Sequence, residues 1–303
     1  MGMYDVLVLG GGPAGLSAAL ALGRVRRSVL ICDNERPRNA ASSHANNLIS
    51  QDGINPSEWR KKARLDLKKY ETVSFLDGTL TSVEKLETYF QGTFLSGERH
   101  TFRKIILAHG VLDVLPTVPG FEELWGKSVF HCPYCHGYEV ADMRLGMVDS
   151  GGFAEHLLPM LSALSKDIVV FTNGISSISP GFKGFLEKKN IQIFEEKIER
   201  LLYQGEILQS VVLKNGTNLE RDALFLAPQF PIRMKSNVGE ILGCKTTEMG
   251  FFQIDDFGRT TVPGVFAAGD IVTFKQSVAG AVALGQAAGA GAAGDLLSED
   301  FNS

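Results

Sequence analysis

The chain has 303 residues, of which 44% are hydrophobic and 21% charged, and its formal net charge is −4 at pH 7. These values describe an ordinary globular protein that is long enough for two domains with a substantial core. Dispersed Lys and Arg residues exclude a basic stripe for nucleic acid, and with no apolar run near the roughly 20 residues of a membrane helix we expect neither an export signal nor a membrane span.

The first elements expected are a strand, a turn and a helix in YDVLVLGGGPAGLSAALALGR, residues 4–24. Gly10, Gly12 and Gly15 fit the pattern G-x-G-x-x-G, in which glycines allow a tight turn, backbone approach to a pyrophosphate and close helix packing. A second strand, RSVLICD, ends in Asp33, which is placed to bond a ribose hydroxyl. This combination predicts a dinucleotide-binding unit and leaves open whether the ligand is FAD or NAD.

The following segments predict scaffold elements. PSEWRKKARLDLKKYE, residues 56–71, is typical of a solvated amphipathic helix. RKIILAHG, residues 103–110, is an apolar strand that ends beside His109. Pro116, Pro119 and Gly120 stop regular structure and favour a linker.

The segment CPYCHGYEV, residues 132–140, holds two cysteines in C-x-x-C spacing. Such a pair can close a redox disulfide or supply two thiolates to zinc. A zinc site usually needs a second half-site, and the other cysteines, Cys32 and Cys244, stand alone in apolar segments where we expect buried thiols. We therefore predict no metal, and a cysteine content this low favours a reducing, cytoplasmic location.

Near the C-terminal end, TTVPGVFAAGD, residues 260–270, predicts a short strand that ends in Gly269 and Asp270. The next segment, KQSVAGAVALGQAAGAGAAGDLL, predicts a helix of small residues. Its start, at Gln276 to Val278, can direct backbone N–H groups at an anionic acceptor.

These two ends, with CPYC between them, resemble the low-molecular-weight thioredoxin reductase family of FAD-dependent disulfide oxidoreductases over nearly the whole chain. The resemblance implies an α/β fold with two dinucleotide-binding, Rossmann-like domains. The FAD domain would be discontinuous, with residues 1–116 and 246–303 enclosing an inserted domain of residues 117–245. A homodimer is the family habit and is expected here.

The resemblance also implies roles for individual residues. FAD is the expected cofactor. The redox pair would be Cys132, which exchanges with the substrate, and Cys135, which faces the flavin. The expected FAD contacts are Gly10, Gly12, Pro13, Ala14 and Gly15 at the pyrophosphate, Asp33 at the adenosine ribose, Gly269 and Asp270 at the ribityl chain, Gln276, Ser277 and Val278 at the polar edge of the flavin ring, and Asn47 beside the flavin.

Two histidines are secondary candidates. His44 lies in the loop NAASSHANNLISQDG, which by resemblance runs along the FAD, and it is a candidate for a functional role. His109 replaces the middle residue of the family's Ala-Thr-Gly, and we expect it to pack or to bond locally.

The inserted domain departs from the family at its own nucleotide motif, LGMVDSGGFAEHLLPML. Aligned on its strand, Ser150 replaces the first glycine, Gly152 remains, and Glu155 takes the small third position, where a carboxylate opposes a pyrophosphate. The basic cluster expected after the strand DIVVF is replaced by TNGISSISPG. We therefore predict that NADPH is not the direct hydride donor and that the second site is empty or open to another nucleotide or a second flavin. The alternative is an eroded nicotinamide site that still works, since bound geometry can tolerate missing motif residues.

The other departure is His136, which stands where the family usually has an aspartate. An imidazole can take a proton from an incoming thiol, and CHGYE resembles the branch that contains dithiol oxidases. We therefore predict an enzyme that oxidises small dithiols and passes the electrons through FAD to oxygen. The alternatives are a reductase of thioredoxin-like proteins fed by ferredoxin, a second flavin or another carrier protein, and a non-catalytic flavoprotein. Tyr134 and Tyr138 are expected to serve in packing.

Overall fold

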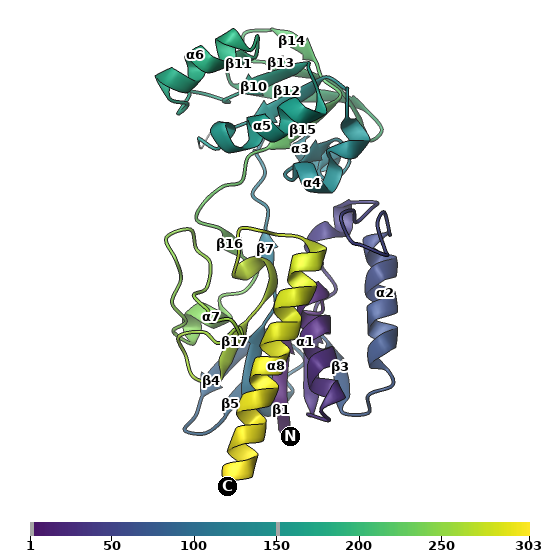
Figure 1. Ribbon diagram of the computed structural model, residues 1–303, viewed down its shortest axis with the longest axis vertical. Coiled ribbons are helices and arrows are strands. Elements are labelled where there is room, and N and C mark those ends of the chain that lie inside the picture. Colours follow the sequence, from purple (N-terminus) through teal and green to yellow (C-terminus); the bar gives the residue numbers. More distant parts are fainter. Residues whose placement is uncertain (1–2, 150–151) are drawn as a thin grey trace. The chain divides into compact units, whose positions relative to one another are not determined.

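The computed structural model describes residues 3–149 and 152–303. The chain forms two compact units. Unit 1 comprises the chain up to Ala40 with Ile54–Asp113 and Phe230–Ser303, and unit 2 comprises Ala41–Gly53 and Val114–Gln229. Each unit carries its own parallel sheet, as the two Rossmann-like domains require (Figure 1).

The elements of unit 1 are the strands β1 (Met3–Leu9), β2 (Val29–Asp33), β3 (Val73–Asp77), β4 (Leu80–Lys85), β5 (Phe90–Phe94), β6 (Arg99–Leu107), β7 (Val111–Leu112), β16 (Arg233–Met234) and β17 (Val265–Ala267) and the helices α1 (Pro13–Arg24), α2 (Pro56–Leu67), α7 (Val238–Ile241), α8 (Val278–Asn302) and η3 (Gly269–Ile271). The short helix η1 (Arg38–Ala41) lies across the first change of unit.

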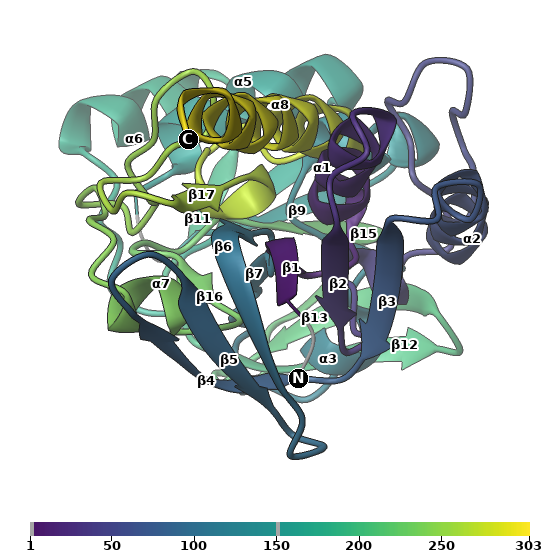
Figure 2. The same cartoon turned by 90° about the horizontal axis from the view of Figure 1, so that it is seen from below.

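The main sheet of unit 1 has the strand order β3-β2-β1-β6-β5-β4, and β17 also pairs with β6 (Figure 2). β3, β2, β1, β6 and β17 run parallel, whereas β5 and β4 continue the sheet as an antiparallel ribbon. Successive residues of a strand point to opposite faces. Val6 and Val8 of β1 accordingly join the core under α1 and α8, and Leu7 and Leu9 join the core on the other face.

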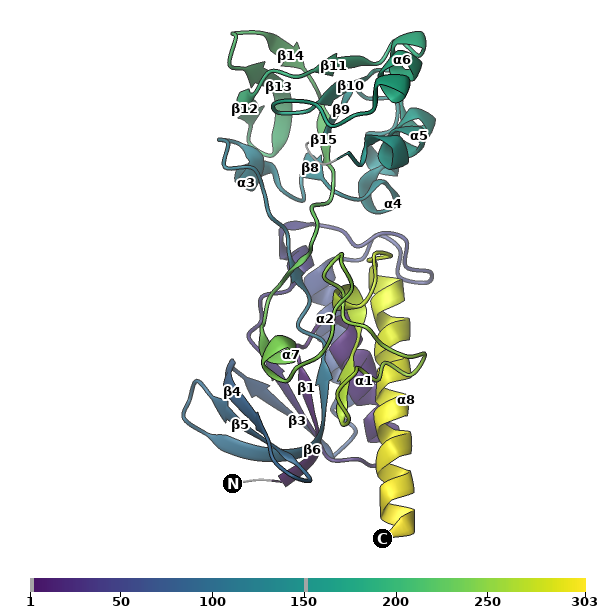
Figure 3. The ribbon, with the colours of Figure 1, turned by 90° about the vertical axis from the view of Figure 1, so that its left-hand side faces the viewer.

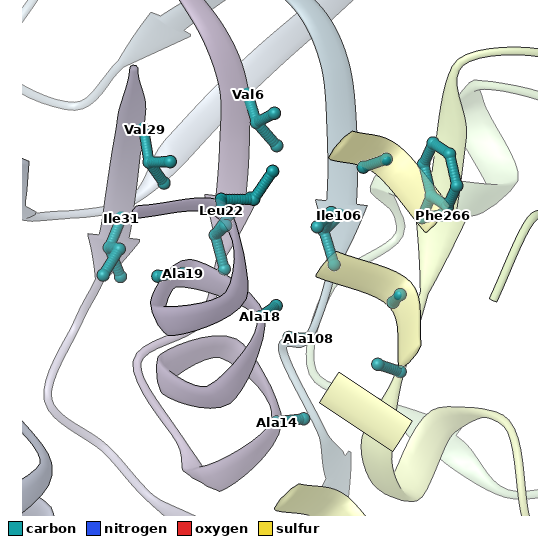
Figure 4. Packing of buried hydrophobic residues seen from close by; sticks show 14 of the residues in the cluster. Val6, Ala14, Ala18, Ala19, Leu22, Val29, Ile31, Ile106, Ala108 and Phe266 are labelled. Carbon is teal, nitrogen blue, oxygen red and sulfur yellow. The ribbon is translucent and has the colours of Figure 1, made fainter. Parts of the chain in front are cut away.

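The small residues of α8 allow it to lie directly on α1 (Figure 4). A Cβ added to Gly285 would stand 2.0 Å from the Ala14 carbonyl oxygen, and one added to Gly289 would stand 2.5 Å from the Ala18 carbonyl oxygen. Both distances are far below van der Waals contact, so glycine is required at both positions. The predicted helix of small residues is thus the element that closes unit 1.

The elements of unit 2 are the strands β8 (Val129–Phe130), β9 (Leu145–Val148), β10 (Ile168–Phe171), β11 (Gln192–Phe194), β12 (Ile198–Gln204), β13 (Ile207–Leu213), β14 (Asn218–Glu220) and β15 (Ala223–Leu226) and the helices α3 (Phe121–Leu124), α4 (Pro133–His136), η2 (Tyr138–Val140), α5 (Ala154–Leu164) and α6 (Pro180–Lys188).

The parallel sheet of unit 2 has the strand order β11-β10-β9-β15-β8. Helices α5 and α6 cover one face, and the antiparallel sheet β12-β13-β14 covers the other (Figure 3). Phe130 and Phe225 belong to the helix side, and Phe171 and Leu224 belong to the side of the antiparallel sheet. Unit 2 therefore has the layers of a dinucleotide-binding domain.

The chain returns to unit 1 at Phe230, earlier than the predicted boundary between residues 245 and 246. The reason is packing, because Val238 and Cys244 are already buried in the unit 1 core with Phe252. β16 also pairs with β7, which ends just before the chain leaves unit 1 for the second time, after Asp113. The loop Ala41–Gly53 belongs to unit 2, although the sequence placed it in the FAD domain.

Candidate functional site

The two cysteines of the C-x-x-C segment lie on one tight turn of unit 2. Cys132 is the N-cap of α4, and Pro133 takes the first helical position, where its missing N–H costs nothing. The Cys132 carbonyl accepts the N–H groups of Cys135 (3.1 Å) and His136 (3.2 Å). The turn brings the Cα atoms of Cys132 and Cys135 to 5.3 Å, within the usual range for a disulfide, and their sulfurs are bonded.

Gly137 lets this turn pack closely. A Cβ at Gly137 would stand 2.4 Å from the Pro133 carbonyl oxygen and 2.5 Å from Leu164 Cδ1. Leu164 is the last residue of α5, so the turn Cys132–Gly137, called the redox turn below, packs against the end of that helix. Only glycine fits this contact without displacing the backbone of the turn.

His136 is held in place on two sides. Its ring stacks on Phe130, with centroids 4.4 Å apart and planes 13° from parallel. Nε2 lies 3.1 Å from Ser42 Oγ, whereas Nδ1 is buried and has no hydrogen-bond partner in the described part of the chain. Burial lowers the pKa of His136, the charge of Glu139 raises it, and His44 lowers it further. His136 is therefore neutral at pH 7 and able to accept a proton.

The loop Ala41–Gly53 supplies two contacts that the sequence did not reveal. Ser42 meets the His136 ring, as described above. The Asn46 side-chain amide donates to the Cys135 carbonyl (2.9 Å) and to Glu139 Oε1 (2.9 Å). Neither residue belongs to a spacing motif, and only the fold brings this loop to the redox turn.

The other candidates of unit 2 lie near this turn in different ways. Within unit 2, the His44 ring contacts the hydroxyl of Ser43 at 2.8 Å. Asn47 adopts a positive φ of 60°, and its N–H donates to Asp52 at 2.6 Å, so its place beside the flavin stays a prediction. The expectation that Tyr134 and Tyr138 serve in packing is wrong, because the two residues are 72% and 88% exposed.

The glycine turn of unit 1 has the geometry of a phosphate cradle. Gly10 has a φ of +114°, and a Cβ there would stand 2.4 Å from the Ala108 carbonyl oxygen. A Cβ at Gly15 would overlap the Gly10 carbonyl oxygen at 1.8 Å. At Gly12, by contrast, nothing lies within 4 Å of the Cβ position, although this residue is the N-cap of α1. The opening lies at a helix N-terminus, which is suited to a pyrophosphate, and Pro13 and Ala14 begin that helix.

Asp33 presents an unused acceptor at the end of β2. Its side chain is buried, and Oδ2 receives no hydrogen bond within the described residues. Arg60 and Arg64 come no closer to Oδ2 than 3.9 and 3.7 Å. A buried carboxylate oxygen needs a donor, and the hydroxyls of a ribose would satisfy it. The residues at this end of unit 1 therefore fit the adenosine and pyrophosphate of FAD.

The third group of predicted FAD residues lies at the start of α8. Gly269, with a φ of +81°, leads into Asp270, and the Gln276 side chain donates to the Asp270 carbonyl at 3.1 Å. Ser277 caps α8 by accepting the Gly280 N–H (3.0 Å), and Val278 is the first helical residue. The structure brings these residues together at one helix N-terminus.

Arg38 is a member of this group that the sequence missed. Its guanidinium donates to Asp270 Oδ2 (2.9 Å), Gln276 Oε1 (2.6 Å) and Asp113 (2.8 Å). The segment NERPRN carries no motif that would single out this arginine. Arg38 fixes two of the side chains that are expected to meet FAD.

His109 follows β6 and is part of the scaffold, as predicted. Its Nδ1 lies 3.1 Å from the Gly110 carbonyl oxygen, and its ring meets Phe252 edge-on, with centroids 6.4 Å apart. Burial lowers its pKa to about 4, an effect that the Gly110 carbonyl opposes and the charge of Lys235 reinforces. The ring is therefore neutral at pH 7.

The turn after β9 corrects the alignment of the second nucleotide motif by one residue. In unit 1, Gly10 follows β1 and its N–H donates to the Cys32 carbonyl at 2.8 Å. In unit 2, Asp149 follows β9 and its N–H donates to the Phe171 carbonyl at 2.9 Å. Asp149 therefore takes the place of the first glycine. The prediction gave that place to Ser150, which lies outside the described residues.

The same register moves the third position from Glu155 to Ala154, which is fully buried and small, as the motif requires. The carboxylate expected to oppose a nucleotide is supplied by Asp149 instead. Asp149 is 1% exposed, and its Oδ2 accepts the N–H of Ala154, the first residue of α5, at 2.5 Å. An acidic side chain of the protein thus occupies the helix N-terminus that would hold a pyrophosphate.

Glu155 makes a similar contact nearby. Its Oε1 accepts the hydroxyl of Ser179 at 2.9 Å, and Ser179 is the N-cap of α6. The segment after β10 contains no arginine. Both helix starts on this side of unit 2 therefore carry carboxylates of the chain itself.

Comparisons with known proteins agree with this architecture. The family model for the pyridine nucleotide-disulphide oxidoreductases matches residues 4–294. "Thioredoxin reductase tcpT" of Claviceps purpurea is 33% identical, over 98% of this chain and 95% of that protein, and "Thioredoxin reductase aclD" of Aspergillus oryzae is 34% identical, over 88% of each. The crystal structure of a putative thioredoxin reductase TrxB from Bacillus anthracis superimposes with a TM-score of 0.93 at 32% identity, over 98% of this chain and all of that one.

Proposed function

We propose a function from one established premise: the chain belongs to the pyridine nucleotide-disulphide oxidoreductase family and is a thioredoxin reductase-like, FAD-dependent disulfide oxidoreductase. The proposal is that it oxidises small dithiols to disulfides, that oxygen is the final electron acceptor, and that it does not use NADPH directly. The observation that carries it is the Asp149 carboxylate bound to the N-terminus of α5.

Asp149 argues against a nicotinamide donor on two grounds. It already satisfies the N–H of Ala154, which a pyrophosphate would otherwise bind. Its charge would also repel a phosphate: at 4 Å, a pair of unit charges costs about 4 kcal/mol at an effective dielectric constant of 20. Without a hydride from this site, electrons would enter either through the thiols, as in this proposal, or from another electron carrier.

The redox turn supports entry of electrons from a dithiol. A substrate thiolate would attack Cys132, and the neutral His136 beside the pair can take the proton of the incoming thiol. Cys135 is the cysteine assigned to the flavin side. Exchange then leaves the substrate oxidised and the Cys132–Cys135 pair reduced.

Most of the residues assigned to FAD lie in unit 1. Gly10, Gly12 and Gly15 with Pro13 and Ala14 would hold the pyrophosphate, and Asp33 the ribose. The remaining contacts are assigned to Asn47, Gly269, Asp270, Gln276, Ser277 and Val278. When bound, FAD supplies a two-electron acceptor for the reduced cysteine pair and a route onward to oxygen.

A second candidate is a reductase of thioredoxin-like proteins. It is favoured by the relatives named thioredoxin reductases. Because Asp149 stands in the nicotinamide site here as well, its electrons would come from ferredoxin, a second flavin or another carrier protein. In either case we propose a cytoplasmic homodimer, from the cysteine content and the family habit. No helix in the described ranges is long and apolar enough to cross a membrane.

The test is anaerobic mixing of the FAD-loaded protein with NADPH, NADH or dithiothreitol while the flavin absorbance is followed. We expect bleaching by dithiothreitol alone and rapid recovery on admission of air, with formation of hydrogen peroxide. Rapid bleaching by a nicotinamide would overturn the role of Asp149. Bleaching by dithiothreitol with slow recovery in air would reject oxygen as acceptor and favour the carrier-fed reductase.

A further inference from the structure

The Ser42 hydroxyl determines which nitrogen of His136 carries the proton. Ser42 Oγ donates its hydrogen to the His44 carbonyl at 2.7 Å. A serine hydroxyl has one hydrogen and two acceptor positions. With that hydrogen engaged, the oxygen can only accept from His136 Nε2, which lies 3.1 Å away. This hydrogen-bond pattern assigns the proton of the neutral imidazole to His136 Nε2.

The opposite nitrogen is left as the base. A neutral imidazole has one protonated and one unprotonated nitrogen, so with Nε2 protonated the lone pair is on Nδ1. Nδ1 is buried and has no hydrogen-bond partner among the described residues. The stacking on Phe130 prevents the ring from tilting away from this orientation. No donor among the described residues competes for that lone pair, so Nδ1 is the ring atom left to accept a proton.

We propose that Ser42 is a positioning residue that fixes His136 as the Nε2–H tautomer, so that Nδ1 is the atom that receives the proton of the incoming thiol. This inference rests on the proposed dithiol oxidation and adds the atom and the residue that make it possible. It assigns a function to the loop Ala41–Gly53, which no spacing motif marks.

The proton and electron balance is as follows. The first substrate thiol gives its proton to Nδ1 while its sulfur bonds to Cys132, which breaks the Cys132–Cys135 bond and releases the Cys135 thiolate. The second substrate thiol then attacks the mixed disulfide; the substrate leaves as a disulfide, and its second proton goes to Cys132. Two electrons and two protons have moved from the dithiol to the protein. Oxygen is the oxidant that finally takes both, as hydrogen peroxide.

The surroundings of His136 agree with a base that stays neutral before the reaction. Phe130 on β8 contributes an uncharged ring. Glu139, beyond α4, and His44, in the loop, are the titratable groups that act on its pKa, in opposite directions. Asn46 bonds both Glu139 and the Cys135 carbonyl, which ties that carboxylate to the redox turn. The ring thus faces one acid whose position is fixed.

The first experiment is ¹⁵N NMR of the imidazole of His136 in the oxidised, FAD-loaded protein, with the signal assigned by the variant His136→Asn. We expect protonated Nε2 and unprotonated Nδ1 in the wild type. Ser42→Ala should mix the two tautomers, and Ser42→Thr, which keeps a hydroxyl, should restore the wild-type pattern. A wild-type ring protonated on Nδ1 would overturn the proposal.

The second readout is the rate of anaerobic flavin reduction by dithiothreitol as a function of pH. We expect Ser42→Ala to be about 10- to 100-fold slower, since a general base contributes about 10²- to 10⁴-fold, and its pH profile to shift. Ser43→Ala is the matched control: its hydroxyl contacts the His44 ring, and its profile should follow the wild type. Unchanged tautomer and pH profile in Ser42→Ala would refute the role of Ser42.

The two readouts separate this inference from the proposed function. If dithiothreitol fails to reduce the wild-type flavin, the proposed dithiol oxidation fails, and with it the catalytic role of Nδ1. The NMR measurement still decides whether Ser42 sets the tautomer, because it is made on the resting protein without any substrate.

Discussion

Removing the Asp149 carboxylate should loosen the start of α5. Asp149 Oδ2 accepts the N–H of Ala154 at 2.5 Å in a site that is 1% exposed. A hydrogen bond to a charged group contributes about 1.5–3 kcal/mol, and a neutral one about 0.5–1.5 kcal/mol. Asp149→Ala should therefore lower the local stability of the start of α5 by about 1.5–3 kcal/mol. Asp149→Asn keeps an oxygen acceptor and should lower it by less.

The assay is hydrogen exchange by mass spectrometry on peptides that cover α5 (Ala154–Leu164). Since 1.4 kcal/mol corresponds to a factor of ten, Asp149→Ala should accelerate exchange at the start of the helix by about 10- to 100-fold. Asp66→Ala, at an exposed position of α2, is the control and should leave this peptide unchanged. Equal protection in the wild type and Asp149→Ala would show that the carboxylate does not hold the helix, and the argument against a pyrophosphate there would fall with it.

Three further predictions concern the redox turn and the other thiols. Gly137→Ala forces a Cβ to within 2.4 Å of a carbonyl oxygen, so it should destabilise the protein by about 1–3 kcal/mol and slow flavin reduction by dithiothreitol. The control Gly184→Ala has open space around the new Cβ and should do neither. Equal melting temperatures of the two variants would contradict the packing argument. Burial lowers the pKa of His136, so the rate of flavin reduction should stay constant as the pH falls to 6.5 and should decrease only at lower pH, where the base becomes protonated. His136→Asn should abolish this decrease. A decrease centred above pH 6.5 in the wild type would contradict the prediction. Cys32 and Cys244 should resist alkylation by iodoacetamide at pH 8 in the folded protein, because burial raises the pKa of both thiols, that of Cys32 to about 11; labelling of either at the rate of a free thiol would refute this.

The parts of the site that the sequence predicted are those encoded by local spacing. Gly10, Gly12 and Gly15 form the expected turn because the backbone geometry of a strand, turn and helix depends on residues next to one another. Cys132 and Cys135 form the expected pair because a single helical turn brings residues three apart together. In both cases the local sequence is sufficient.

The parts that the sequence did not predict depend on contacts between distant segments. Ser42 and Asn46 reach the redox turn from a loop about ninety residues earlier in the chain. Arg38 meets Asp270 across an even longer separation. The register of the second nucleotide turn was shifted by one residue, because only the backbone hydrogen bond of Asp149 to the neighbouring strand identifies the first position. For polar residues outside a motif, the local sequence does not indicate which distant residues they will contact.

The close packing of α8 on α1 has a consequence for the order of events during synthesis. Unit 2 needs only residues up to Gln229, all of which precede the return of the chain to unit 1. Unit 1 lacks β17 and α8 until the last part of the chain is synthesised. Until then, the apolar face of its sheet that α8 covers stays exposed. Because domains generally fold as units as they leave the ribosome, we expect the inserted unit to fold first and the enclosing unit to close only after release of α8.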